Sequence, residues 1–151
     1  MKLSEIVTKS CIFIDLKVAS KRALFKEISQ MISQKTKLNV NDILEKLNER
    51  EKLGSTTIGD GVAIPHTKIS GLKKVFSLFI KLKNSIDFSS SDSSDVDLIF
   101  VIIAPKESQS EHLMALAKIS GFLKIKKNVD KLRKTKSQDE VYNLLESFNE
   151  A

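Results

Sequence analysis

The chain has 151 residues, 41% of them hydrophobic and 29% charged. This length and composition fit a single folded domain over residues 1–151 and disfavour intrinsic disorder. The longest uninterrupted apolar run, Leu98–Ala104, is far too short to cross a bilayer, and the N-terminus lacks the apolar stretch of a secretion signal. A single cysteine, Cys11, cannot form an internal disulfide. Together these features predict a cytoplasmic protein that does not span a membrane.

The formal net charge of +6 admits a nucleic-acid-binding alternative. The lysines, however, are scattered, and the densest cluster, Lys124–Lys134, is interrupted at helical spacing by Ile125, Val129 and Leu132. That pattern is typical of the solvent-facing side of an amphipathic helix. We therefore expect no nucleic acid partner, and a steep salt dependence of DNA binding would be the sign of one.

The first predicted elements are a strand and two helices. Cys11–Leu16 has the composition of a strand. Ser20 can cap a helix, and Asn39 or Asn41 can cap a second one that carries Arg50 near its end and stops at Gly54. Apolar residues three and four positions apart predict the buried faces: Leu24, Ile28, Met31 and Ile32 in the first helix, and Ile43, Leu44 and Leu47 in the second.

Two further strands are predicted in the middle of the chain. They are Val75–Leu82 and Val96–Ala104, with the polar run Ser89–Asp95 as the loop between them. The second strand is almost entirely apolar, which favours a central position with both faces buried, and Pro105 is expected to end it.

The C-terminal part is predicted to be helical. Ser108 or Ser110 can cap a long helix, and Ser137 with Glu140 three residues on forms a capping-box pattern for the last one. The predicted stripes are Leu113, Leu116, Ala117 and Ser120 in the former, and Val141, Leu144, Leu145 and Phe148 in the latter. Because strands and helices are interleaved, we expect an α/β fold, a single domain with a mixed β-sheet flanked by helices on both faces.

Most enzyme signatures are missing from the sequence. It contains no GxxxxGK[ST] loop, no CxxC pair, no HExxH and no GxSxG. Two histidines make a weak case for zinc, and no metal and no dissociable cofactor is predicted. Counting residue types alone leaves a Ser-His-Asp arrangement open.

The chemistry centres on His66, in the run Gly59–Lys68 (GDGVAIPHTK). Pro65 cannot donate to a sheet ladder, so it should break the strand just before the histidine and help to aim the imidazole outward. Neutral imidazole is a nucleophile that can accept a phosphoryl group. Arg50, and the N–H groups and hydroxyls of the run Gly54–Gly59, could stabilise the phosphoryl oxygens. On these residues alone, an ordinary surface or core histidine is the more common interpretation.

A resemblance to a known family changes that balance. The run Arg50–His66 (REKLGSTTIGDGVAIPH) resembles the active-site signature of the enzyme IIA domain, fructose–mannitol type, of the bacterial phosphotransferase system. Val96–Pro105 followed by Glu111–Ala117 (EHLMALA) is similar to that family's strand and the helix start after it. The resemblance covers the chain from Leu3 to about Leu145. Within the family, the Gly-Ser-Thr-x-Ile-Gly-x-Gly run is most similar to the nitrogen-regulatory IIA group.

The resemblance implies a mechanism and a set of partners. An HPr- or NPr-type phosphocarrier would donate a phosphoryl group to Nε2 of His66, giving tele-phosphohistidine. Arg50 would neutralise the charge of the phosphoryl group, and His112 would hydrogen-bond a phosphoryl oxygen or orient His66. Downstream partners would be regulatory targets in ion transport or signalling, or a sugar-specific IIB component. Thr67, where many relatives carry Gly, is expected to stiffen the turn after the histidine, and Asp60 stands where relatives carry Glu or Asn.

Two other functions stay open at this point. The chain could pass phosphate to a separate IIB–IIC sugar transporter instead of serving regulation. It could also be a protein-binding module whose histidine is never phosphorylated, and a phosphate-transfer assay separates that alternative directly.

Overall fold

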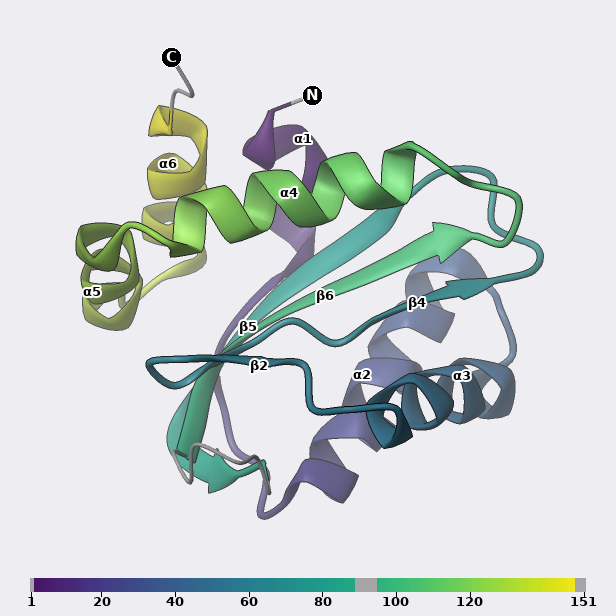
Figure 1. Cartoon of the computed structure of the whole chain (residues 1–151). Helices are drawn as coiled ribbons and strands as arrows, with labels where there is room; N and C mark the ends of the chain where they lie inside the picture. The colour runs from purple at the N-terminus through teal and green to yellow at the C-terminus, as the bar shows by residue number, and fades with distance from the viewer. Residues whose placement is uncertain (1, 89–94, 149–151) are drawn as a thin grey trace.

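A computed structural model describes residues 2–88 and 95–148 (Figure 1). Its elements are α1 (Leu3–Ile6), a 3₁₀ helix η1 (Lys9–Cys11), β1 (Ile12–Leu16), α2 (Lys21–Thr36), α3 (Val40–Lys52), β2 (Thr57–Gly59), β3 (Val62–Ala63), β4 (His66–Ile69), β5 (Phe76–Asp87), β6 (Asp95–Pro105), α4 (Glu111–Leu123), α5 (Lys126–Lys134) and α6 (Gln138–Ser147). Apart from Asp95, the predicted polar loop lies outside the described residues. Over the described ranges, no helix has the length and apolar character needed to cross a membrane.

Strand β6 is the centre of a mixed sheet. The strand order is β1-β5-β6-β3-β2, and β4 pairs with β6 as well. On one edge β6 runs antiparallel to β5, while on the other it runs parallel to β3 and then to β4. Its apolar run is buried from Val96 to Ala104, apart from the half-buried Asp97. The predicted central strand that is buried on both faces, and ends at Pro105, is therefore confirmed.

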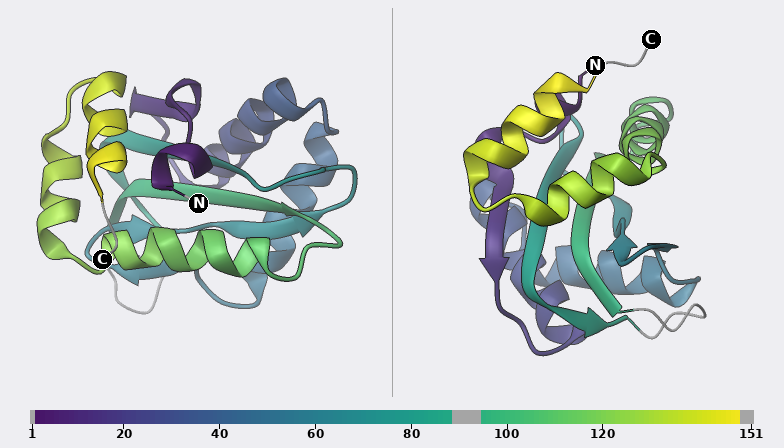
Figure 2. Two further views of the ribbon diagram at one scale, coloured as in Figure 1. Left: turned by 90° about the horizontal axis from the view of Figure 1, so that it is seen from above. Right: turned by 90° about the vertical axis from the view of Figure 1, so that its left-hand side faces the viewer.

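Helices cover both faces of this sheet, as Figures 1 and 2 show. Alternate residues of β6 feed two separate cores, because successive side chains of a strand point to opposite faces. Leu98, Phe100 and Ile102 pack with α1, α4, α5 and α6, and the intervening residues, Ile99, Val101 and Ile103, pack with α2 and α3. The predicted α/β class with a mixed sheet between helices is confirmed.

Side-chain caps begin three of the helices where the sequence predicts them. Ser20 Oγ accepts from Ala23 N at the start of α2, and Asn39 rather than Asn41 caps α3. Ser137 Oγ accepts from Glu140 N at the start of α6. The carboxylate of Glu140 accepts from the preceding Lys136 N at 2.7 Å, so only half of the predicted capping box forms as expected.

The predicted stripe of α4 is mostly wrong, although Leu116 is partly buried against the core. The stripe that packs on the sheet is Ala115, Ile119, Phe122 and Leu123, whereas Leu113 is 62% exposed and Met114 50% exposed. Apolar residues occur all around this helix, so their spacing alone could not decide which side would be buried. In the lysine-rich helix α5, Val129 and Leu132 are buried as predicted, but Ile125 precedes the helix and is 46% exposed.

Candidate functional site

Pro65 divides one edge of β6 between two short strands. Strand β3 ends at Ala63 and β4 begins at His66, and both run parallel to β6. Ile102 N donates to Pro65 O at 3.0 Å, so the chain stays against β6 across the break. Proline supplies no N–H of its own, and the predicted break before the histidine is present. The turn expected after the histidine is wrong, because Thr67 lies inside β4, opposite Ile103.

One hydrogen bond fixes the ring of His66. Its Nδ1 lies 2.7 Å from the carbonyl oxygen of Ile64. A carbonyl oxygen can only accept, so Nδ1 carries the proton and Nε2 keeps its lone pair. His66 is paired with Ile102, whose side chain faces the α4 side of the sheet. The half-buried imidazole therefore lies on the α4 side of the sheet.

His112 comes from that same side. It is the second residue of α4, and its ring centroid is 5.5 Å from that of His66, with the planes tilted by 45°. The N-cap residue of α4 is Ser110, which makes no side-chain cap hydrogen bond, but the backbone N of His112 donates to Ser108 Oγ at 3.3 Å. The side-chain Nδ1 of His112 is buried and has no hydrogen-bond partner among the described residues. Buried polar atoms without a partner are uncommon in native proteins, and a catalytic role is one of the reasons for them.

The surroundings of both imidazoles favour the neutral form. Burial lowers the pKa of His66, opposed by the hydrogen bond to Ile64, and the charge of Arg50 lowers this pKa further while that of Glu51 raises it. Burial also lowers the pKa of His112, and the charges of His66 and Lys68 act in the same direction. Neutral His66 can act as a nucleophile near pH 7.

Arg50 lies at the C-terminal end of α3, close enough for its charge to act on His66. Its Nη1 donates to Gly54 O at 3.0 Å. The guanidinium also borders a cleft of about 710 Å³ between α3 and β4. The cleft is lined by Lys46, Glu49, Arg50, Lys52, Leu53, Thr67, Lys68, Ile69, Ser70 and Lys106. The predicted residues His66 and His112 thus lie together, Arg50 is within electrostatic range of His66, and Arg50 is the member of the three that lines the cationic cleft.

The loop between α3 and β2 has less free hydrogen-bonding capacity than the sequence indicates. Gly54 N donates to Glu51 O, Thr56 N donates to the Glu51 carboxylate, and Thr57 N donates to Ser55 Oγ. Several groups predicted to hold phosphoryl oxygens are therefore already occupied within the loop. A residue missed by sequence reasoning, Glu51, accounts for much of this order. Its signal was its place inside the signature run, next to Arg50.

A second missed residue, Arg133, lies behind the β2–β3 turn. Its Nε and Nη2 donate to the two carboxylate oxygens of Asp97 at 3.0 and 2.8 Å, and Nη2 also donates to Asp60 O. Asp60 and Gly61 form the turn with φ of 56° and 76°. This guanidinium ties α5 to the hairpin that leads into His66. The described residues contain no group of three or more His, Cys, Asp or Glu side chains that could hold a metal ion.

Comparison with known proteins agrees with this geometry. Residues 5–148 match the family model "Phosphoenolpyruvate-dependent sugar phosphotransferase system, EIIA 2". A nitrogen regulatory protein of Bradyrhizobium diazoefficiens is 39% identical over 145 residues, which are 96% of this chain and 95% of the relative. A fructose-specific EIIABC component of Bacillus subtilis is 29% identical over 96% of this chain, but only 23% of that relative is covered. The crystal structure of nitrogen regulatory protein IIA-Ntr from Neisseria meningitidis superposes with a TM-score of 0.89 at 36% identity, covering 95% of this chain and 98% of that one.

Proposed function

The chain belongs to the EIIA type 2 family of the phosphoenolpyruvate-dependent sugar phosphotransferase system, and from this we propose that it is a phosphocarrier that accepts a phosphoryl group on His66 and serves regulation. The nitrogen regulatory relatives, which match over nearly their whole length, support the regulatory role. The donor is an HPr-type phosphocarrier, itself phosphorylated on histidine.

The observation that carries the proposal is the hydrogen bond between His66 Nδ1 and Ile64 O. It leaves the lone pair of Nε2 available to attack phosphorus. In the transfer, the N–P bond to the donor histidine breaks and an N–P bond to Nε2 forms. The electron pair of the broken bond returns to the donor imidazole, and the His66 proton stays on Nδ1, where Ile64 O still accepts it. No other reactant is required.

Two neighbours support this step. Arg50 offers a permanent positive charge beside His66, and a guanidinium near a phosphoryl group in transfer stabilises its oxygens. His112, near the N-terminus of α4, hydrogen-bonds a phosphoryl oxygen or holds the His66 ring, and that helix end adds a partial positive charge.

The surroundings of the site favour a protein as the donor. Leu53 borders the cationic cleft and is 84% exposed, and Leu113, next to His112, is 62% exposed. Large apolar side chains beside a reactive group are typical of protein docking surfaces. A carrier that docks on these side chains brings its phosphohistidine to His66.

A second function has one observation in its favour. The chain is 29% identical to a segment of a fructose-specific EIIABC component. In that function, phosphate would leave His66 for a sugar-specific IIB component.

Labelling with phosphate tests the proposal. Incubation with enzyme I, an HPr-type carrier and labelled phosphoenolpyruvate is expected to give an acid-labile, alkali-stable label, as phosphohistidine does. His66→Ala should stay unlabelled, and His112→Ala, which keeps His66, should still be labelled. Label that persists in His66→Ala would refute the assignment, and an unlabelled wild-type protein would favour the binding-module alternative.

A further inference from the structure

A buried carboxylate lies next to Arg50. The side chain of Glu51 is 8% exposed and pairs with Lys21 Nζ at 2.8 Å, a lysine at the start of α2. The same lysine donates to Phe88 O at 3.3 Å and lies 4.5 Å from the centroid of the Phe88 ring. A buried charge needs this degree of pairing, and removing its partners would be costly. Glu51 is thus fixed by an element remote in the sequence.

The other contacts of Glu51 lead toward the site. Its Oε1 accepts from Thr56 Oγ1 at 2.8 Å, and its Oε2 accepts from Thr56 N at 3.2 Å. Thr56 is itself 5% exposed. Both donors of this threonine are therefore turned toward one carboxylate, which fixes the orientation of the residue just before β2.

Thr56 in turn holds the residue that orients the nucleophile. Ile64 N donates to Thr56 O at 3.0 Å, and Ile64 O accepts from His66 Nδ1 at 2.7 Å. A continuous chain of hydrogen bonds therefore runs from Lys21 through Glu51, Thr56 and Ile64 to the imidazole. The N–H that bonds Thr56 and the carbonyl that bonds His66 both belong to Ile64. A shift of Thr56 would therefore move the carbonyl that selects the tautomer of His66.

We propose that Glu51 is a positioning residue for phosphoryl transfer: through Thr56 and Ile64 it keeps the proton of His66 on Nδ1 and so keeps Nε2 free to attack. The role of Glu51 in phosphoryl transfer rests on the function proposed above. Its role in selecting the tautomer of His66 does not. Glu51 does not touch the reacting atoms. Loss of Glu51 should therefore lower the rate of phosphoryl transfer and leave the affinity for the carrier unchanged.

Glu51→Gln tests this because the amide has nearly the same shape but only one acceptor oxygen, so it cannot receive the two donors of Thr56 on separate oxygens, and it has no charge with which to form an ion pair with Lys21. Glu45→Gln is the matched control, since it makes the same change of charge on an exposed position of α3. Long-range ¹H–¹⁵N spectra of the imidazole report which nitrogen of His66 carries the proton. Rates with a phosphorylated HPr-type carrier give kcat and KM separately.

In the wild-type protein and in Glu45→Gln we expect the Nδ1-protonated tautomer to dominate. In Glu51→Gln the spectra should show a mixture of tautomers, and kcat should fall roughly tenfold or more with KM nearly unchanged, as for loss of a hydrogen bond to a charged group. An unchanged tautomer and kcat in a folded Glu51→Gln protein, whatever its melting temperature, would overturn the proposal. So would an equal loss in Glu45→Gln.

A second pair of variants decides the matter if Glu51→Gln does not fold. Thr56→Val removes the hydroxyl at nearly constant shape, and Thr56→Ser restores it. The tautomer mixture and lowered kcat should appear in Thr56→Val and be rescued in Thr56→Ser, and two identical spectra would overturn the proposal. If even the wild-type protein takes up no phosphate, the proposed function fails, while the spectra still decide the role of Glu51 in positioning His66.

Discussion

Arg50 acts on His66 through its charge before any partner binds. Burial, and to a smaller extent the positive charge of Arg50, lowers the pKa of His66, which favours the neutral imidazole. In the proposed transfer, the same charge would attract the arriving phosphoryl group and stabilise it on His66.

Arg50→Ala is expected to slow phosphorylation of His66 by about 10²–10³, the usual effect of removing one donor from a developing charge. Its melting temperature should stay close to that of the wild type, because the hydrogen bond of Arg50 that is lost goes to the exposed Gly54. Rapid-quench rates and thermal unfolding measure the two effects. Lys52→Ala, which removes a different cation of the same cleft, is the control.

A large fall in melting temperature with a normal transfer rate would show that Arg50 has a structural role instead. His112→Ala should give a smaller rate defect, because a neutral hydrogen bond contributes less than a guanidinium contact. Loss of the His112 Nδ1 atom in this variant should change the free energy of unfolding little, because that atom makes no hydrogen bond among the described residues.

The pH profile of phosphorylation should follow His66. Only neutral imidazole attacks phosphorus, and burial lowers the pKa of His66. The rate should stay level as pH falls from about 8 to about 6.5, the ordinary pKa of histidine, and decline only at lower pH. In Arg50→Ala a positive charge is gone, so the pKa rises and the decline should begin at a higher pH. Identical profiles for the two proteins would contradict this.

The same shifts affect stability in a defined direction. Unfolded histidines take up a proton near pH 6.5, whereas folded His66 and His112 do so only at lower pH. Between those pKa values the unfolded state binds more protons, so the free energy of unfolding falls as pH falls through that window. Urea unfolding should show a smaller pH dependence in the double variant His66→Ala/His112→Ala.

At the scale of elements, the β2–β3 hairpin positions the segment that carries His66. Its two-residue Asp60-Gly61 turn has positive φ at both positions, the geometry that suits the twist of paired strands. A Cβ added at Gly61 would collide with Nη2 of Arg133 and lie 3.0 Å from Asp97 Oδ1. Glycine is therefore favoured there by its backbone angle and leaves room for the guanidinium in its observed position.

Gly61→Ala should lower stability more than Gly59→Ala. Both substitutions place a side chain at positive φ, which costs of order 1–3 kcal/mol, but a Cβ at Gly59 meets no atom within 4 Å. The difference in the free energy of unfolding between the two variants measures the collision with Arg133. An equal loss in the free energy of unfolding in the two variants would mean that the contact of Arg133 with the hairpin contributes little to stability.

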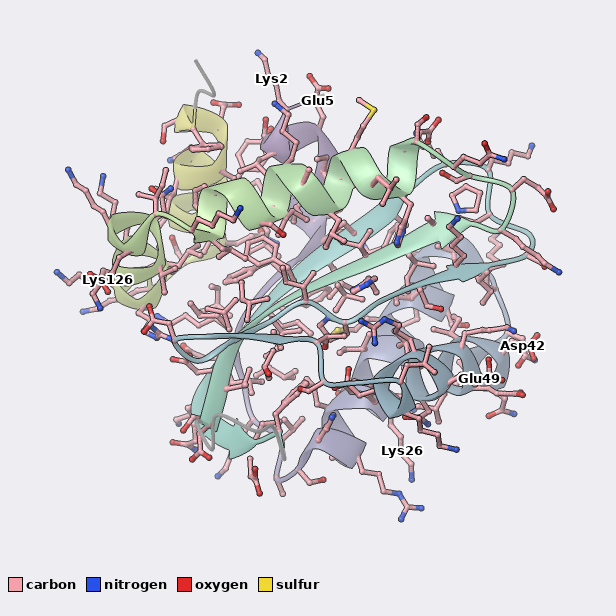
Figure 3. All side chains as sticks on the ribbon, in the orientation of Figure 1. Lys2, Glu5, Lys26, Asp42, Glu49 and Lys126 are labelled. Carbon is pink, nitrogen blue, oxygen red and sulfur yellow. The ribbon has the colours of Figure 1, made fainter. Side chains whose placement is uncertain are left out.

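At the scale of the whole molecule, charge is spread over the surface but positive charge gathers in the cleft that Arg50 borders. The labelled side chains of Lys26, Lys126 and Glu49 project from different edges of the molecule (Figure 3). The cleft bordered by Arg50, in contrast, combines five cations with Glu49. Phosphorylation would add about two negative charges next to this cleft. A partner that docks through carboxylates would be repelled, and one that docks through arginines would be favoured.

This difference leads to a test of regulation against sugar delivery. Protein loaded with phosphate on His66 is mixed with membranes, IIB proteins and candidate sugars. We expect the label to persist, and pull-downs with the phosphorylated and free forms to recover different partners, with His66→Ala behaving as the free form. Rapid discharge that depends on one sugar and its IIB protein would refute the regulatory role.

Much of the fold could be predicted because the relevant forces act within short segments. The caps at Ser20 and Ser137 and the buried strand β6 follow from local hydrogen bonding and apolar spacing. The burial of α4 could not be predicted in this way. Its apolar residues cover more than one side, and only the position of the sheet determines that Ala115 is buried and Leu113 exposed.

For the candidate site, the sequence by itself determined the chemical groups: an imidazole after a proline, a guanidinium at a helix end, and a signature run that joins them. Tertiary structure alone decided how they are arranged. It placed the His112 ring 5.5 Å from that of His66, paired Glu51 with Lys21, and brought Arg133 to the hairpin. The spacing of residue types along the sequence indicates which residues share a face of one helix or strand. Contacts between side chains on separate elements depend on how the sheet brings those elements together.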